Sequence, residues 1–159
     1  MTNHITIFSY AATLSSSRPG LRLKNVLVPL DFTESTDQSL TYASVLGREF
    51  GCTLTLLHVV DLKIVAGEHG LPSTRFLDEM KSAAERTLRE AALSLCLPNT
   101  KTVVRIAEPA VGILKEVAES DIDLIIMGRH RRKSIGQFLS PSTVNKVRSG
   151  APCPTLLAT

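Results

Sequence analysis

From residue 24 onward the chain alternates short apolar runs with longer segments of helical periodicity, and this alternation constrains its fold more than any other feature. The runs occupy residues 25–30, 53–60, 102–107, 123–128 and 154–158. The first of them, NVLVPL, is too continuously apolar to alternate with polar residues, which is typical of a strand covered on both faces. Strands that alternate with helices indicate βαβ units with right-handed crossovers, and therefore a parallel sheet with helices on both faces.

The segments between the runs carry apolar residues at spacings of three and four, which is the pattern of amphipathic helices. The first is predicted over residues 35–50, where Ser35 followed by Gln38 forms a capping-box pair and Gly51 supplies the end. Further helices are predicted over 74–95, from Pro109 onward, and over 141–149. Residues 61–73 contain two glycines and a proline and are predicted to form a loop.

The length of 159 residues and a hydrophobic content of 43% fit one globular domain. We therefore predict a single open doubly wound α/β domain over residues 23–159, with a five-stranded parallel sheet. Residues 1–22 end in the Ser-rich sequence SSSRPG and are predicted to be a flexible N-terminal extension. This extension has no basic start before its apolar stretch, so a signal peptide is not expected.

Composition excludes several classes of protein. Cys52, Cys96 and Cys153 are odd in number and form no CxxC motif, which argues against a disulfide framework and a cysteine zinc site and predicts a reducing, cytoplasmic location. No apolar run approaches the ~18 residues of a membrane span. A net charge of +3, with two Tyr, five Phe and no Trp, makes a nucleic-acid-binding module an unfavoured alternative.

In a doubly wound sheet, ligands bind beyond the carboxyl ends of the strands, where the strand order reverses. That rule directs attention to Pro29 and Asp31 after the first strand, to Val59 late in the second, and to Met127 onward. The first turn, PLDFTEST, contains no glycine, so neither a dinucleotide fingerprint nor a P-loop is present. His58, in an apolar strand, is predicted to be a satisfied core or strand-end histidine rather than a catalytic base.

The stretch GRHRRKSIGQFLSPSTVNKV offers a second candidate feature, because a basic loop leads into a helix. Ser140 is a good N-cap and Pro141 a good first helical residue. The free N–H groups of Ser142 and Thr143, with their hydroxyls, would face an anion, and Arg131 would raise the local potential. A solvated basic loop followed by an ordinary capped helix is the alternative interpretation.

Four pieces of the sequence, in this order, resemble the universal stress protein family: NVLVPLDFTESTDQSL, TLTLLHVVD, IDLIIMGRH and VNKVRSGAPCPTLL. The resemblance covers residues 24–158. It implies a five-stranded parallel sheet in order 3-2-1-4-5 with helices on both faces. It also implies a homodimer that forms through the C-terminal strand, and many family members bind ATP.

Carried over to this chain, the resemblance places Asp31 near adenine and ribose, with Pro29 beside it. It gives Val59 a backbone contact to adenine, and puts Met127 and Gly128 at the lip of the pocket. The phosphate motif of nucleotide-binding members has glycine, two residues, glycine, nine residues, then glycine and Ser or Thr. Gly128 keeps the first glycine, whereas Arg131 and Pro141 replace the other two ahead of Ser142.

These replacements weaken the predicted phosphate site, because a side chain at Arg131 obstructs close backbone approach and Pro141 removes a donor. We therefore expect a cytoplasmic stress-response dimer with weakened or absent ATP binding. An ATP-binding switch with slow or no hydrolysis is the alternative, and binding of nucleic acid or an acidic partner through the basic loop is a third class. No catalytic triad order, carboxylate pair or metal spacing predicts an enzyme, and no metal is expected except Mg²⁺ accompanying a nucleotide.

Overall fold

A six-stranded sheet forms the centre of the computed structural model, which describes residues 6–8, 22–63, 72–128 and 139–158. The strands are β1 (Thr6–Phe8), β2 (Asn25–Pro29), β3 (Thr53–Asp61), β4 (Thr100–Ala107), β5 (Leu124–Gly128) and β6 (Thr155–Ala158). Their order across the sheet is β1-β6-β5-β2-β3-β4. Strands β2 to β6 are all parallel. The predicted five-stranded parallel sheet in order 3-2-1-4-5 is therefore confirmed.

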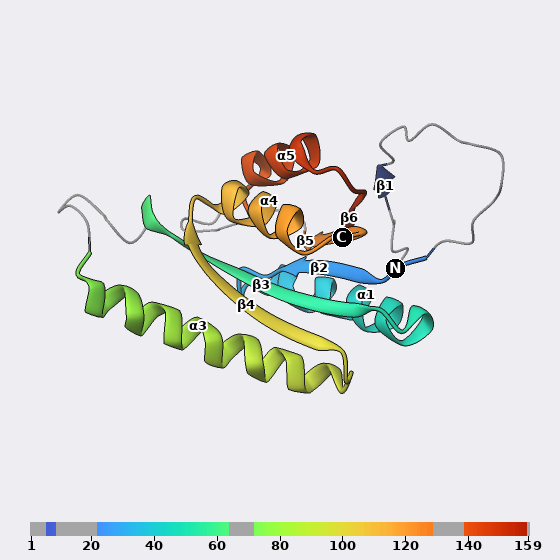
Figure 1. Cartoon of the computed structure of the whole chain (residues 1–159), viewed down its shortest axis with the longest axis horizontal. Helices are drawn as coiled ribbons and strands as arrows, with labels where there is room; N and C mark the ends of the chain where they lie inside the picture. The colour runs from blue at the N-terminus through green and yellow to red at the C-terminus, as the bar shows by residue number, and fades with distance from the viewer. Residues whose placement is uncertain (1–5, 9–21, 64–71, 129–138, 159) are drawn as a thin grey trace.

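Helices cover both faces of this sheet, as the alternation of elements predicted (Figure 1). They are α1 (Glu34–Phe50), α3 (Thr74–Leu95), α4 (Pro109–Glu119) and α5 (Pro141–Gly150). Helices α1 and α3 lie on one face over a core that includes Val26, Leu54 and Ile126. Helices α4 and α5 lie on the other face over Leu27, Leu57 and Ile125. Alternate residues of each central strand thus supply two separate cores, which explains why those strands are continuously apolar.

The helix ends follow their local capping chemistry, with one difference from the prediction. Helix α1 begins at Glu34 with Thr33 as the N-cap, so Ser35 lies inside the helix and the predicted capping box is wrong. Gly51 ends this helix with φ +61°, a left-handed conformation that glycine adopts without strain. Glu108 caps α4 and Ser140 caps α5, and in both helices proline occupies the first turn as predicted.

Strand β1 was not predicted. Residues 6–8, in the N-terminal extension, pair antiparallel with β6 in the register Thr6↔Leu157, Ile7↔Leu156 and Phe8↔Thr155. Figure 1 shows β1 beside β6 at the edge of the sheet, next to the C-terminus. The parallel sheet therefore gains one antiparallel strand at its edge, contributed by a segment more than a hundred residues away in sequence.

Candidate functional site

The strand order reverses between β2 and β5, which creates the switch point that the sequence predicted. The chain runs from β2 through β3 to β4 in one direction, then crosses back to β5 on the other side of β2. Helix α1 leaves β2 on one face, and α5 follows β5 on the opposite face. A crevice is expected between such diverging connections, at the carboxyl ends of the two strands.

Three predicted residues lie at this edge. The register Val26↔Leu124 and Leu27↔Ile125 places Pro29 beside Met127 when it is extended by two residues. Pro29, Met127 and Gly128 are all buried. They form the apolar base of the switch point and present no ionisable group to a ligand.

Asp31 follows β2 directly, and its carboxylate is held by the start of α1. Its Oδ1 accepts hydrogen bonds from the Thr33 hydroxyl at 2.6 Å and from the Thr33 N–H at 3.2 Å. The Thr36 hydroxyl lies 3.5 Å from the same oxygen. Asp31 therefore orders the entry to α1, and this structural role fixes the orientation of its carboxylate at the switch point.

The turn that carries Asp31 is also fixed from β3. Phe32 has φ +58°, a conformation that costs a non-glycine residue roughly 1–2 kcal/mol. Its ring stacks on His58, with centroids 4.4 Å apart and planes 18° apart. His58 Nδ1 lies 2.8 Å from the Leu30 carbonyl oxygen, which can only accept, so Nδ1 carries the hydrogen. The prediction of a satisfied strand-end histidine is confirmed.

The charge state of His58 follows from its environment. Burial lowers the pKa of His58, although the hydrogen bond to Leu30 and the charge of Asp31 act in the opposite direction. The imidazole is therefore neutral at pH 7 and serves as a flat, uncharged platform for Phe32. The sequence contained no signal for this stack, because residues 32 and 58 meet only when β2 and β3 pair.

The N-terminus of α5 differs from the predicted anion site. Ser140 Oγ accepts the Thr143 N–H at 3.3 Å, and it lies 2.8 Å from Ser142 Oγ and 3.1 Å from Thr143 Oγ1. Thr143 is buried, whereas Ser142 is exposed. The predicted free N–H of Thr143 is thus occupied by the cap. Since Pro141 has no N–H, Ser142 supplies the one donor among the first three helical residues that this cap does not use.

Val59 lies buried on the α4 face of the sheet. It pairs with Arg105 of β4, and a Cβ built on Gly112 would come within 2.9 Å of both its methyl groups. Gly112 therefore lets α4 approach β3 closely at this point. The side chain of Val59 is committed to this packing, so the predicted contact to adenine would have to come from its backbone.

A polar contact joins the helices on this face. The Glu108 carboxylate caps α4 by accepting the Val111 N–H at 3.1 Å, and it also accepts from Lys146 Nζ of α5 at 3.1 Å. The hydrogen bond from Lys146 lowers the pKa of Glu108. This contact fixes the N-terminal end of α4 against α5.

Arg131 lies outside the described residues, so its predicted role at the phosphate end stays a prediction. Within the described ranges, no group of three or more His, Cys, Asp or Glu side chains is arranged to hold a metal ion. The same residues include no helix with the length and apolar character needed to cross a bilayer.

A sequence model that describes the universal stress protein family matches residues 22–159. The chain belongs to the universal stress protein family. Among its relatives, universal stress protein A homolog 2 of Coxiella burnetii is 29% identical over 136 residues, which cover 84% of this chain and 92% of that protein. The universal stress protein sequence thus begins where the N-terminal extension ends.

Solved structures of universal stress proteins share the fold. Universal stress protein UspA from Lactobacillus plantarum superposes with a TM-score of 0.73 at 25% identity, covering 88% of this chain and 100% of that one. A universal stress protein from Archaeoglobus fulgidus in complex with dAMP superposes with a TM-score of 0.60 at 17% identity, covering 87% of this chain and 100% of that one. At that identity, the second match speaks for the fold alone.

Proposed function

We propose that this universal stress protein binds an adenine nucleotide weakly at the switch point, and that it holds the nucleoside end rather than the phosphates. The observation that carries the proposal is the state of the α5 N-terminus, where Pro141 lacks an N–H and the Thr143 N–H donates to Ser140. A helix that began with free donors would be suited to a chain of phosphates. This helix offers few of them.

The nucleoside end has better support. The Asp31 carboxylate is oriented by α1, and a carboxylate can accept from ribose hydroxyls in addition to its protein donors. Pro29, Met127 and the backbone of Val59 would supply the apolar and main-chain surface for adenine. A protein of this fold from Archaeoglobus fulgidus was solved with dAMP, a monophosphate, which is the class of ligand that such a divided site favours.

The phosphate end is expected to lose affinity in proportion to its missing donors. A hydrogen bond to a charged group contributes about 1.5–3 kcal/mol, or roughly tenfold to a hundredfold in affinity. Arg131 would recover part of this through its guanidinium, which pairs well with phosphate oxygens. We therefore propose a binding protein without ATP hydrolysis, in which Mg²⁺ would enter only with a nucleotide.

An ATP-binding switch with slow hydrolysis is the second candidate, and the length of the capping hydrogen bond between Thr143 and Ser140 favours it. The Ser140–Thr143 bond measures 3.3 Å, and Ser140, Ser142 and Thr143 place three hydroxyls together. Rotation of Ser140 away from the helix would release the Thr143 N–H to an anion. Release of inorganic phosphate from ATP, above the rate of a Ser142→Ala variant, would support this alternative.

Reversion of the phosphate motif tests the proposal. The double variant Arg131→Gly and Pro141→Gly should bind ATP at least ~10-fold more tightly while AMP binding changes much less, because Pro141→Gly restores one backbone donor and Arg131→Gly lets the backbone approach the added phosphates. Pro98→Gly, an exposed proline outside the site, is the matched control. Titration calorimetry measures both ligands. Equal gains for AMP and ATP would contradict the division of the site.

We also propose a cytoplasmic homodimer that forms through β6. Strand β6, the outermost of the parallel strands, carries no charged side chain, and uncharged strands of this kind favour pairing with a second copy once their outer edge is free. Pairing across a two-fold axis would be isologous. The cysteines Cys52, Cys96 and Cys153 are free thiols, which supports a reducing compartment. Light scattering over a range of protein concentrations tests the dimer, and a chain that stays monomeric up to millimolar concentration would contradict it.

A further inference from the structure

The two edges of the described sheet are protected against pairing with another chain in different ways. At one edge, β4 carries Lys101 and Arg105, and charged side chains on an edge strand discourage pairing with another chain. Near the other edge, β6 reads Thr-Leu-Leu-Ala, and three of its four residues are buried. An uncharged strand of this kind needs its outer backbone groups to be covered by another segment.

Strand β1 provides that cover from within the same chain. The inner edge of β6 pairs with β5 in the register Ile125↔Thr155 to Gly128↔Ala158. The outer edge pairs with residues 6–8, and β1 is antiparallel although its neighbours are parallel (Figure 1). Both hydrogen-bonding edges of β6 are therefore occupied in a single copy.

We propose that β1 is an intramolecular competitor for the outer edge of β6, and that β6 of a second copy takes this edge when β1 leaves it. The two pairings exclude each other, because each backbone N–H and carbonyl on that edge can join only one neighbouring strand. The inference rests on the proposed homodimer through β6. It adds that β1, a segment of the same chain, sets the balance between monomer and dimer.

The size of β1 makes such competition feasible. Only three residue pairs join β1 to β6. Ordering three residues costs conformational entropy of the same size as the few hydrogen bonds return, so the pairing can open. Its advantage is the covalent tether, because two segments joined within one chain meet at an effective concentration on the order of millimolar when the linker is short. A second copy at micromolar concentration must compete against that value.

The family relationship fits this arrangement. The match to the universal stress protein family begins at residue 22, so β1 is an addition outside the part of the chain that the family shares. The parallel strands β2 to β6 complete the expected sheet without it. A segment that is not needed to build the fold can leave the edge without breaking the core.

The test uses the full chain with Thr6→Pro and Ile7→Pro together. Successive N–H groups of a strand point to opposite edges, so one of the two prolines removes a donor that faces β6 in either register. The matched control is Thr6→Val with Ile7→Val, which keeps strand propensity and the backbone donors. Sedimentation equilibrium should show a dimer dissociation constant at least ~10-fold lower for the proline variant than for the unaltered chain and the control.

A peptide of residues 2–12 should then shift the proline variant back toward monomer, and the same peptide with both prolines should not. A proline variant that remains monomeric would overturn the β6 dimer and this inference together. Equal dimer constants for all three chains would leave the dimer standing and overturn the competition. A dimer that is weakened by the prolines would show that β1 joins two copies instead, which also overturns it.

Discussion

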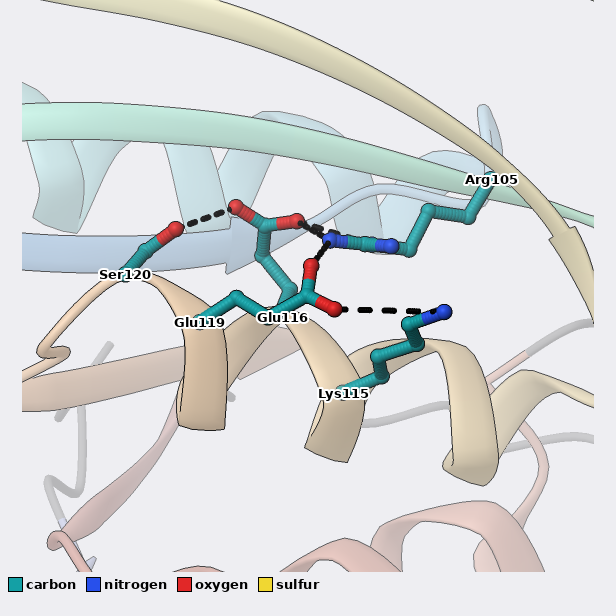
Figure 2. Close-up of polar contacts among 5 residues, drawn as sticks. All are labelled: Arg105, Lys115, Glu116, Glu119 and Ser120. Carbon is teal, nitrogen blue, oxygen red and sulfur yellow. Dashed lines mark hydrogen bonds and ion pairs between the residues drawn. The ribbon is translucent and has the colours of Figure 1, made fainter.

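Arg105 of β4 and Glu116 of α4 form a partly buried ion pair that ties the edge strand β4 to the helix above it. Arg105 Nε lies 2.8 Å from Glu116 Oε2, and the Glu116 side chain is 5% exposed. The Ser120 hydroxyl donates to the other oxygen of Glu116 at 2.7 Å. Figure 2 shows Arg105 reaching from β4 to both Glu116 and Glu119. The pair holds α4 against β4, at the position where Arg105 is in register with Val59 of β3.

Glu116→Ala should lower the free energy of unfolding by about 2 kcal/mol, because Arg105 and Ser120 lose the buried carboxylate to which they donate, while Arg105 keeps Glu119 as a partner. Glu119→Ala is the matched control. Its side chain is 50% exposed, so its loss should cost no more than ~1 kcal/mol. Chemical denaturation measures both variants. Similar values for the two would show that burial of Glu116 does not govern the pair.

Gly112→Ala should destabilise the protein by about 1–2 kcal/mol, even though alanine favours a helix more than glycine does. The new Cβ would lie 2.9 Å from both methyl groups of Val59, a β-branched side chain that is stiff about χ1. Adding Val59→Ala to Gly112→Ala should remove the clash, so a double-mutant cycle by denaturation should show favourable coupling. Additive effects of the two substitutions would contradict the close contact.

The free energy of unfolding at acidic pH should depend on Glu108. Its folded pKa is lowered, so its contribution is present above the unfolded pKa of about 4.3 and is lost as the pH falls through the folded value. The stability difference between the unaltered chain and Glu108→Gln should therefore be greatest near neutral pH and shrink below about pH 4. It should also shrink in high salt, because Lys146 is exposed. A difference that grows on acidification would contradict this assignment.

His58 should produce a second pH dependence in a higher window. Burial lowers its folded pKa, so the unfolded chain takes up a proton first, and stability should fall as the pH drops below the unfolded value of about 6.5. His58→Gln does not titrate and should lose this component of the profile. Urea denaturation from pH 7.5 to 5 measures it. A profile that is the same in both proteins over that range would exclude His58 as its source.

The parts of the fold that depend on regular patterns were predictable from the sequence. Continuous apolar runs such as the one ending at Leu30 identified the buried strands, and prolines 109 and 141 marked two helix starts. The choice between Thr33 and Ser35 as the first cap was not predictable in this way. Both are hydroxyl residues near the end of a strand, and the hydrogen bonds of Asp31 to the chain at Thr33 decide it.

Features that depend on distant contacts were outside the reach of the sequence patterns. Strand β1 is only three residues long and pairs with the last strand of the chain. The two strands are far apart in sequence, so no hairpin motif joins them from which the pairing could have been predicted. The strained backbone of Phe32 is explained by stacking on His58, which exists only in the assembled sheet. At the candidate site, Ser140 as the cap of α5 and Pro141 as its first residue were predictable from the sequence. That the Thr143 N–H donates to Ser140, and is therefore not free, became clear only from the geometry.

The ratio of ATP affinity to AMP affinity, measured by titration calorimetry on the unaltered chain, tests the central claim most directly. A site that holds the nucleoside through Asp31 and offers α5 few donors should bind AMP, and should bind ATP no more than ~10-fold more tightly. An ATP preference of ~100-fold or more would contradict the account, because it would require a working phosphate site at the start of α5. Absence of AMP binding would contradict it as well, since the nucleoside end would then be closed.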